Sequence, residues 1–442
     1  MVTAQNPAGV SHEHRRMINK ARQQTDALFD IVRPDAIYDR PIPERHRMVF
    51  YVGHLEAFDW NLLNHRLFNL DSINPDFDRL FAFGIDPVGG GLPTDQPSDW
   101  PAIERVQDYV HRVREKVDSK LEAAEFTSSN PENDPDILLG VAVEHRLMHA
   151  ETLAYMLHQL PHSSKIAPSQ PSLLLTRSPS QSMISIPEGV AILGLARDGG
   201  AFGWDNEFEE QKIQVAAFDI DKYMVTNRDF LDFVNDNGYN TRSLWSDADW
   251  DWKVTDQISH PVFWNGRGDE WRYRTMFEEV PLPLDWPVYV SHAEASAFAR
   301  WAGKALPTEA QWHRAAYGRA NGPENSSYPW GADPPRPARG NFDFQRWDPI
   351  PVNALPAGDS VFGVSGLLGN GWEWTSTAFG PLPGFERFAF YPGYSADFFD
   401  GKHFVMKGGS PRTAARMLRR SFRNWFQPRY QYVYAGFRCV SA

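Results

Sequence analysis

The strongest constraint on the fold of this chain is a change in sequence pattern near residue 165. Before it, apolar residues recur at spacings of three and four, which is typical of amphipathic helices. After it, short apolar runs alternate with clusters of turn residues, which is typical of short strands. A polar segment rich in Ser and Pro separates the two patterns, as a linker does. We therefore expect domains at residues 1–163 and 183–442, joined by a linker at 164–182.

The first domain is predicted to be a helical bundle. Helical periodicity extends over four stretches, 11–32, 43–68, 101–126 and 141–160. We expect Pro43 to open the second helix, because proline is tolerated in a first turn, and Asp134 or Asp136 to cap the fourth. Four amphipathic helices indicate a four-helix bundle. The segment 81–100 is rich in Gly and Pro and long for a bundle connection, so we expect a functional loop there.

The second domain is predicted to be α+β with a large irregular fraction, which makes the whole chain an α+β multidomain protein. One helix is expected, at 291–303. Ser291 and Glu294 form the sequence signature of a capping box, and Gly303 is placed to end the helix.

Composition excludes several classes of function. The chain has 442 residues with 56 acidic and 44 basic side chains, a net charge of −12, which argues against nucleic acid or an anionic membrane as a partner. Its one cysteine, Cys439, excludes an internal disulfide framework and a cysteine-based metal cage. We see no signal peptide and no transmembrane segment, so we expect a soluble, cytoplasmic protein. The 16 Trp suggest aromatic packing or a pocket for an apolar or cationic ligand.

Two histidines stand out in the helix predicted at 141–160. His145 and His149 are four residues apart, so both rings lie on one face and can reach a single point. Such pairs are frequent by chance, and a third ligand strengthens the interpretation. His54 lies in an apolar stretch of the second helix, where a buried ring needs partners for its nitrogens. The alternative for His54 is a core histidine bonded to a carbonyl or carboxylate.

The other histidines of the first domain fall mostly on polar faces or helix ends, so we interpret them as surface residues. They are His12, His14, His46, His65, His111, His158 and His162. Among them His65 is the strongest competitor as a ligand. Asp59 and Glu151 are either acceptors that fix the tautomers of the ligands or solvated side chains.

Three histidines without an obvious carboxylate leave open positions on a metal. That donor set favours redox or oxygen chemistry at iron over a closed structural site.

The sequence also resembles a known family. GHLEAFDWNLL and EHRLMHAETL resemble the iron-binding helices of the DinB-like domain in ergothioneine-biosynthetic sulfoxide synthases, the EgtB family. The second half resembles the formylglycine-generating-enzyme fold, which is related to C-type lectins. The matching segments are IPEGVAILG, FGWDNEF, VTNRDFLDFV, PVYVSHAEASAFARWAGKALPTEAQWHRAA, GLLGNGWEWTST, KGGSPRT and AGFRCV.

The resemblance implies a reaction and a cofactor. The family uses Fe(II) and O2 to join the imidazole C2 of hercynine (trimethylhistidine) to the sulfur of a thiol, giving a sulfoxide. By this resemblance, His54, His145 and His149 hold the iron. A thiolate then donates charge to the iron and prepares it for O2.

The resemblance also implies substrate contacts in the second domain. FRNWF resembles the hercynine-binding segment of the family, which makes Asn424 and Trp425 candidates, since Trp faces attract quaternary ammonium groups. YPGYS resembles the segment with an active-site tyrosine, so Tyr391 is the candidate proton donor and Tyr394 a pocket residue. Ordinary core or loop packing is the alternative for Trp425 and Tyr391.

Three departures from the family pattern concern the donor. The loop 81–100 has no Arg or Lys, whereas members that use γ-glutamylcysteine have arginines there that bind carboxylates. Phe426 stands where the family has a carboxylate, and Met148 where glutamine is common. These changes favour cysteine, or a neutral sugar as in the selenoneine synthase branch, which uses a selenosugar. We assign Phe426, Met148 and Arg429 to the substrate-binding set. Arg420, Arg423 and Arg429 either bind a carboxylate or bridge loops.

Other classes of function explain less of the sequence. A non-catalytic or carbohydrate-binding module explains the second domain and leaves the three histidines unexplained. A formylglycine-generating oxidase needs active-site cysteines, and Cys439 is the only cysteine. A thiol transferase that uses zinc or nickel explains the histidines and leaves the second domain unexplained.

Overall fold

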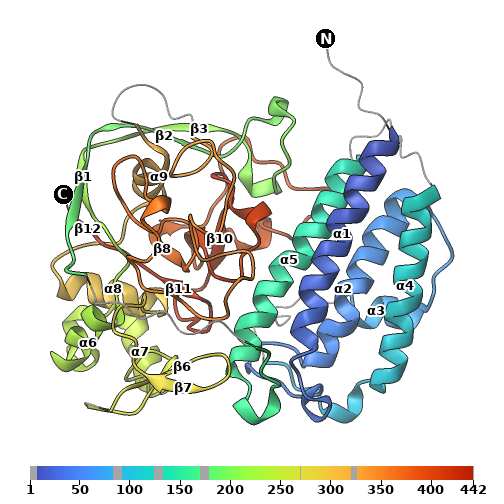
Figure 1. Cartoon of the computed structure of the whole chain (residues 1–442), viewed down its shortest axis with the longest axis horizontal. Coiled ribbons are helices and arrows are strands. Elements are labelled where there is room, and N and C mark those ends of the chain that lie inside the picture. Colours follow the sequence, from blue (N-terminus) through green and yellow to red (C-terminus); the bar gives the residue numbers. More distant parts are fainter. Residues whose placement is uncertain are drawn as a thin grey trace. The chain divides into compact units, whose positions relative to one another are not determined.

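The computed structural model describes residues 7–82, 92–123, 133–169, 179–268, 270–319 and 326–441. The chain divides into two compact units, residues 1–168 and 169–442 (Figure 1). The first unit is helical and the second mixes short strands with helices, so the predicted α+β multidomain class is confirmed. Part of the expected linker, residues 170–178, lies outside the described residues.

Among its described residues, the first unit has four long α-helices and one short one, and Figure 1 shows the long helices side by side as a bundle. The helices are α1 (Pro7–Phe29), α2 (Met48–Leu63), α3 (Pro75–Leu80), α4 (Ile103–Ala123) and α5 (Pro135–Gln159). Helix α1 packs on α4 and α5, and α2 packs on the same two helices. Asp134 is the N-cap of α5, since its carboxylate accepts the backbone N–H groups of Asp136 and Ile137, and Pro135 follows at the first helical position.

Helix α2 begins later than the sequence suggested. The expected start at Pro43 is wrong, because residues 42–45 form a turn and the N–H of Met48 bonds to the carbonyl of Asp39. Proline also disfavours a helical conformation of the residue before it, Ile42. At its other end the helix continues as a π-helical turn, Asn64–Phe68. Asn69 ends this turn and has a left-handed backbone conformation, with φ at 48°.

An ion network, buried at its centre, joins the four long helices. Arg146 of α5 lies 2.8 Å from Glu56 and 2.7 Å from Asp59, both on α2, and all three are at most 2% exposed. Arg114 of α4 bonds to Glu56 at 2.8 Å and to Asp26 of α1 at 2.7 Å. Burial disfavours ionisation of Glu56, but the arginine charges outweigh it and lower its pKa to about 2. The network therefore fixes the register of the helices at this level.

The second unit is built from short strands in four sheets. The strands are β1 (Met183–Ile186), β2 (Gly189–Leu193), β3 (Gln211–Val215), β4 (Phe218–Asp221), β5 (Trp264–Asn265), β6 (Arg272–Arg274), β7 (Glu279–Pro281), β8 (Gly371–Ala378), β9 (Phe404–Gly409), β10 (Asn424–Phe426), β11 (Ala435–Gly436) and β12 (Val440–Ser441). The sheet orders are β1-β4-β12, β10-β9-β8-β11, β2-β3 and β5-β6-β7. In the four-stranded sheet β10 is an edge strand, antiparallel to β9, and places Trp425 opposite Val405.

The expectation of a single helix in this unit is wrong. The predicted helix is α8 (His292–Trp301), with the Ser291–Glu294 capping box present. Three nine-residue helices accompany it, α6 (Asn227–Asn235), α7 (Asp247–Thr255) and α9 (Glu309–Tyr317). The capping boxes at Thr226 and Thr308 are the sequence signals that mark two of them.

No helix in the described parts of the chain combines the length and the apolar character needed to cross a bilayer.

The ion network predicts a large effect of a single substitution. Arg146→Met removes a charge that compensates two buried carboxylates, so we expect the free energy of unfolding to fall by about 3–5 kcal/mol. Arg79→Met is the matched control, since its pair with Asp76 is exposed at 74% and 86% and its loss changes stability by less than about 1 kcal/mol. Urea unfolding followed by circular dichroism measures both. Equal effects of the two substitutions would contradict the role of the network.

Candidate metal centre

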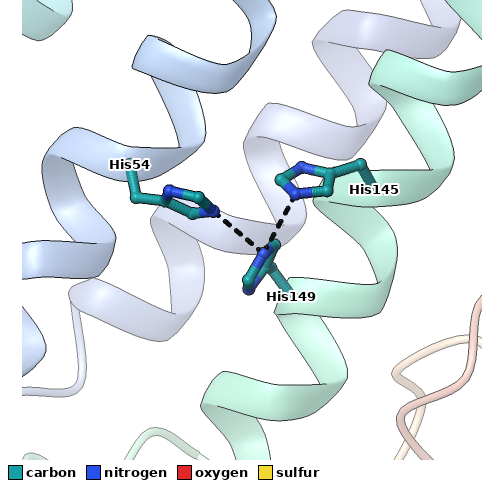
Figure 2. Close-up of side chains that lie close together, drawn as sticks. All are labelled: His54, His145 and His149. Atoms are coloured by element: carbon teal, nitrogen blue, oxygen red, sulfur yellow. Dashed lines mark hydrogen bonds between the residues drawn. The ribbon is translucent and has the colours of Figure 1, made fainter. Parts of the chain in front are cut away.

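Three histidines converge in the helical unit. His54 comes from the middle of α2, and His145 and His149 come from successive turns of α5 (Figure 2). Each is 4% exposed. Figure 2 shows the three imidazoles pointing toward one another, and among the described residues they form the one cluster of His, Cys, Asp or Glu suited to a metal ion.

The separations fit a single metal ion. Nε2 of His149 lies 3.1 Å from Nε2 of His54 and 3.2 Å from Nε2 of His145. Two ligands at right angles, each about 2.1 Å from a metal, are about 3.0 Å apart. The ligand atoms of all three histidines lie within 4.8 Å of one another, which is compatible with a shared cation. The two α5 ligands follow from the helical spacing, and the third from the packing of α2 against α5.

Burial keeps the three imidazoles neutral, which metal binding requires. Burial lowers the pKa of His54 to about 4, although its hydrogen bond with the carbonyl of Phe81 acts in the opposite direction. Burial lowers the pKa of His145 and of His149 well below 6.5, and the neighbouring histidines add to the effect. At neutral pH each ring therefore presents a lone pair to a metal without first losing a proton.

Aromatic rings hold two of the imidazoles in place. Phe58 stacks on His145 with the ring centroids 3.4 Å apart and the planes at 9°. Phe50 stacks on His54 at 4.8 Å and 22°. Both phenylalanines belong to α2, four residues from His54 on either side, so one helix supplies a ligand and the rings that orient two ligands.

The remaining sequence-based interpretations of this unit are partly corrected. His65 is exposed and does not join the cluster. The surface interpretation is wrong for His14 and His158, which are 8% and 1% exposed. Asp59 is neither solvated nor a histidine acceptor, because it pairs with Arg146, and Glu151 is buried at 8% exposure.

The candidate tyrosines and Trp425 of the second unit lie in one aromatic cluster. Trp425 is half-buried and stacks on Phe379 at 4.1 Å and 6°. Tyr394 meets the edge of Trp425 at 5.4 Å and stacks on Trp204 at 3.9 Å. The ring of Tyr391 is 5.6 Å from that of Tyr394. Asn424 is half-buried and its side-chain oxygen accepts the N–H of Trp425.

The arginines near this segment have acidic partners. Arg429 bonds to Asp249 at 3.0 Å, Arg423 bonds to Glu309 at 2.9 Å, and Arg420 lies 3.6 Å from Glu210. Each pair connects segments far apart in the sequence. These contacts show the arginines bridging distant segments, and carboxylate binding stays a prediction.

The remaining candidates for substrate binding are Phe426, Met148 and the loop at 81–100. Phe426 is half-buried and stacks on Tyr430 at 5.1 Å. Met148 is half-buried on α5, directly before His149. The part of the loop at residues 83–91 lies outside the described residues.

Sequence reasoning missed three contributors to the site. These are the carbonyl of Phe81, which receives the Nδ1–H of His54, the Phe58 ring, and Arg146 with its carboxylates. Helical spacing offers a signal for one of them only, since Phe58 lies four residues, and so one turn, after His54.

Two family models match the chain. The DinB superfamily matches residues 17–153, and the sulfatase-modifying factor enzyme 1-like domain matches residues 172–442. The chain is 35% identical over 406 residues to "Hercynine oxygenase" of Mycolicibacterium thermoresistibile, covering 85% of this chain and 87% of that protein. It is 34% identical over 337 residues to "Hercynine oxygenase" of Mycobacterium tuberculosis, covering 76% and 77%. It is 28% identical over 494 residues to "Ergothioneine biosynthesis protein 1" of Neurospora crassa, covering 92% and 55%.

The cluster predicts stoichiometric metal binding. We expect one Fe(II) per chain in anaerobic titrations of the purified protein, and a loss of affinity of at least about 100-fold when His54, His145 or His149 is changed to Gln, since even outer partners of ligands contribute 10- to 100-fold. His65→Gln is the control, because this histidine is exposed. Wild-type affinity in all three cluster variants would exclude the site.

Proposed function

The chain belongs to the EgtB-like family of ergothioneine-biosynthetic enzymes, and we propose that it joins the imidazole C2 of hercynine to the sulfur or selenium of a donor. The observation that carries the proposal is the buried cluster of His54, His145 and His149 in a bundle of the family's type. The names of the relatives place them in hercynine oxidation and ergothioneine biosynthesis. The chain is accordingly an oxidative enzyme.

The proposed reaction is balanced without a further reductant. Hercynine C2–H and a donor R–SH lose two hydrogens, a C–S bond forms, one oxygen atom of O2 becomes the sulfoxide oxygen, and the other leaves as water. The same balance holds with selenium. Fe(II), when bound by the three histidines, supplies the one-electron chemistry that O2 requires.

The protein's own contribution at this site is a neutral, buried set of imidazoles. The imidazoles add no negative charge, so a divalent ion keeps its full attraction for an anionic donor such as a thiolate or selenolate. Burial of all three rings keeps bulk water from hydrogen-bonding to their nitrogens.

We propose that the donor is either small or carries no charge on the part that is remote from its sulfur or selenium atom. The segment 81–100 contains neither Arg nor Lys, and Phe426 stands where the family has a carboxylate. Arg429, the nearest arginine in sequence to Phe426 on its C-terminal side, is already paired with Asp249. This charge pattern favours cysteine or a selenosugar over γ-glutamylcysteine.

We assign hercynine recognition to the aromatic cluster of the second unit. The trimethylammonium group of hercynine is a weakly hydrated cation, and Trp and Tyr rings attract such groups. Trp425 and Tyr394 meet edge to face at 5.4 Å, which suits the lining of a cation-binding pocket. Asn424 lies beside them as a hydrogen-bonding group, and Tyr391, whose ring is 5.6 Å from that of Tyr394, is the proposed proton donor.

The burial of the single cysteine, Cys439, argues against formylglycine generation. Cys439 is buried, and burial raises the pKa of its thiol well above the usual value, so it is an inert core residue.

A product assay tests the proposed function. We expect the Fe(II)-loaded protein with hercynine and O2 to give an adduct by mass spectrometry, with a higher rate for cysteine or a selenosugar than for γ-glutamylcysteine. The His54→Gln variant is the control for metal dependence. No adduct with any donor, when iron is bound, would refute the reaction. A preference for γ-glutamylcysteine would refute the assignment of the donor.

The aromatic cluster predicts a specific kinetic defect. Trp425→Leu removes a cation–π partner worth about 0.5–2 kcal/mol, so the KM for hercynine should rise about 2- to 30-fold with a smaller change in kcat. Trp330→Leu is the matched control. Trp330 is also half-buried in this unit, but it stacks on Tyr328 instead. A change of KM by the same factor in both variants would assign Trp425 to packing alone.

A further inference from the structure

Gly53 is an unusual residue for its position. It lies inside α2, directly before His54, and is buried. Glycine is the poorest helix former after proline, and an alanine would suit the helical backbone better. The space beside it explains the glycine, because a Cβ built there meets three ring atoms of Phe81 at 2.6 Å, closer than real Cβ contacts.

The ring of Phe81 cannot move aside easily, because it is fully buried. It stacks on Trp100 with centroids 6.3 Å apart and on Tyr109 at 6.2 Å, and it meets Phe77 edge to face at 5.5 Å. Its backbone N–H also bonds to the carbonyl of Phe77, which fixes its main chain at the end of α3. A side chain at position 53 would therefore displace the whole residue.

The carbonyl of Phe81 reaches the metal centre. It lies 2.7 Å from Nδ1 of His54. Since a carbonyl only accepts, the proton of this neutral imidazole sits on Nδ1, and Nε2 carries the lone pair that faces His149. The hydrogen bond thus selects the tautomer that is able to bind a metal through Nε2.

We propose that Gly53 and Phe81 form a positioning pair for His54, in which the missing side chain at Gly53 lets Phe81 pack on α2 and hold the His54 tautomer. This inference rests on the proposed metal site and not on the identity of the substrates. Neither residue touches the metal, so both act through His54.

The test uses the full-length protein as Gly53→Ala, Phe81→Ala and the double variant, each checked for folding by circular dichroism. In metal-free protein labelled with 15N-histidine, the ring-nitrogen resonances of His54, assigned by their loss in His54→Gln, report which nitrogen carries the proton. Anaerobic titration with Fe(II) gives the affinity. Neither measurement requires hercynine or O2, so the result is independent of whether the product assay succeeds.

We expect Gly53→Ala to lose the pure Nδ1–H tautomer and to bind Fe(II) about 10- to 100-fold more weakly. In the Phe81→Ala background, where the clashing ring is gone, the same glycine substitution should change neither quantity further. Wild-type tautomer and affinity in Gly53→Ala would overturn the proposal. An equal loss of affinity with and without the Phe81 ring would also overturn it, because the effect would then not pass through Phe81.

Discussion

The buried ion pair of Arg146 with Glu56 and Asp59 is the interaction on which the geometry of the helical unit depends. A buried charge is costly unless it is paired with an opposite charge, so the helices are held in an arrangement that pairs all three groups. Glu56 follows His54 by two residues, and Arg146 follows His145 directly. An arrangement of α2 and α5 that satisfies the ions therefore also brings the third histidine to the other two.

Burial raises the free energy of the charged groups in the helical unit, and it also keeps the three histidines neutral. An imidazole in water has a pKa near 6.5 and is therefore about half protonated at that pH. Burial lowers the pKa, so a buried imidazole stays neutral at pH values well below 6.5. His54 illustrates the balance, because burial lowers its pKa to about 4 while the Phe81 carbonyl stabilises the Nδ1 proton. The ligand set is neutral before a metal arrives, so binding does not require the release of protons from the rings.

The parts of this molecule that were predictable from sequence are those with local causes. The i, i+4 spacing placed His145 and His149 together, and the capping box at Ser291 marked the start of α8. The presence of His54 in the same cluster was predictable because a histidine in an apolar helix needs partners. The Phe81 carbonyl was not predictable, because a backbone group 27 residues from His54 leaves no trace in side-chain pattern. The start of α2 was missed for a similar reason, since a turn closed by hydrogen bonds of Ile42 and Asp39 competes with the helix.

The two units differ in the chemistry of the side chains that they bring together. In the described residues, the histidine cluster suited to a metal ion lies in the helical unit, and its three rings are buried. The second unit has a single, buried thiol, so it offers no redox-active cysteine pair, and its distinctive feature is the aromatic cluster around Trp425. Rings of this kind recognise a cation by its charge and apolar surface together, which a carboxylate does not do.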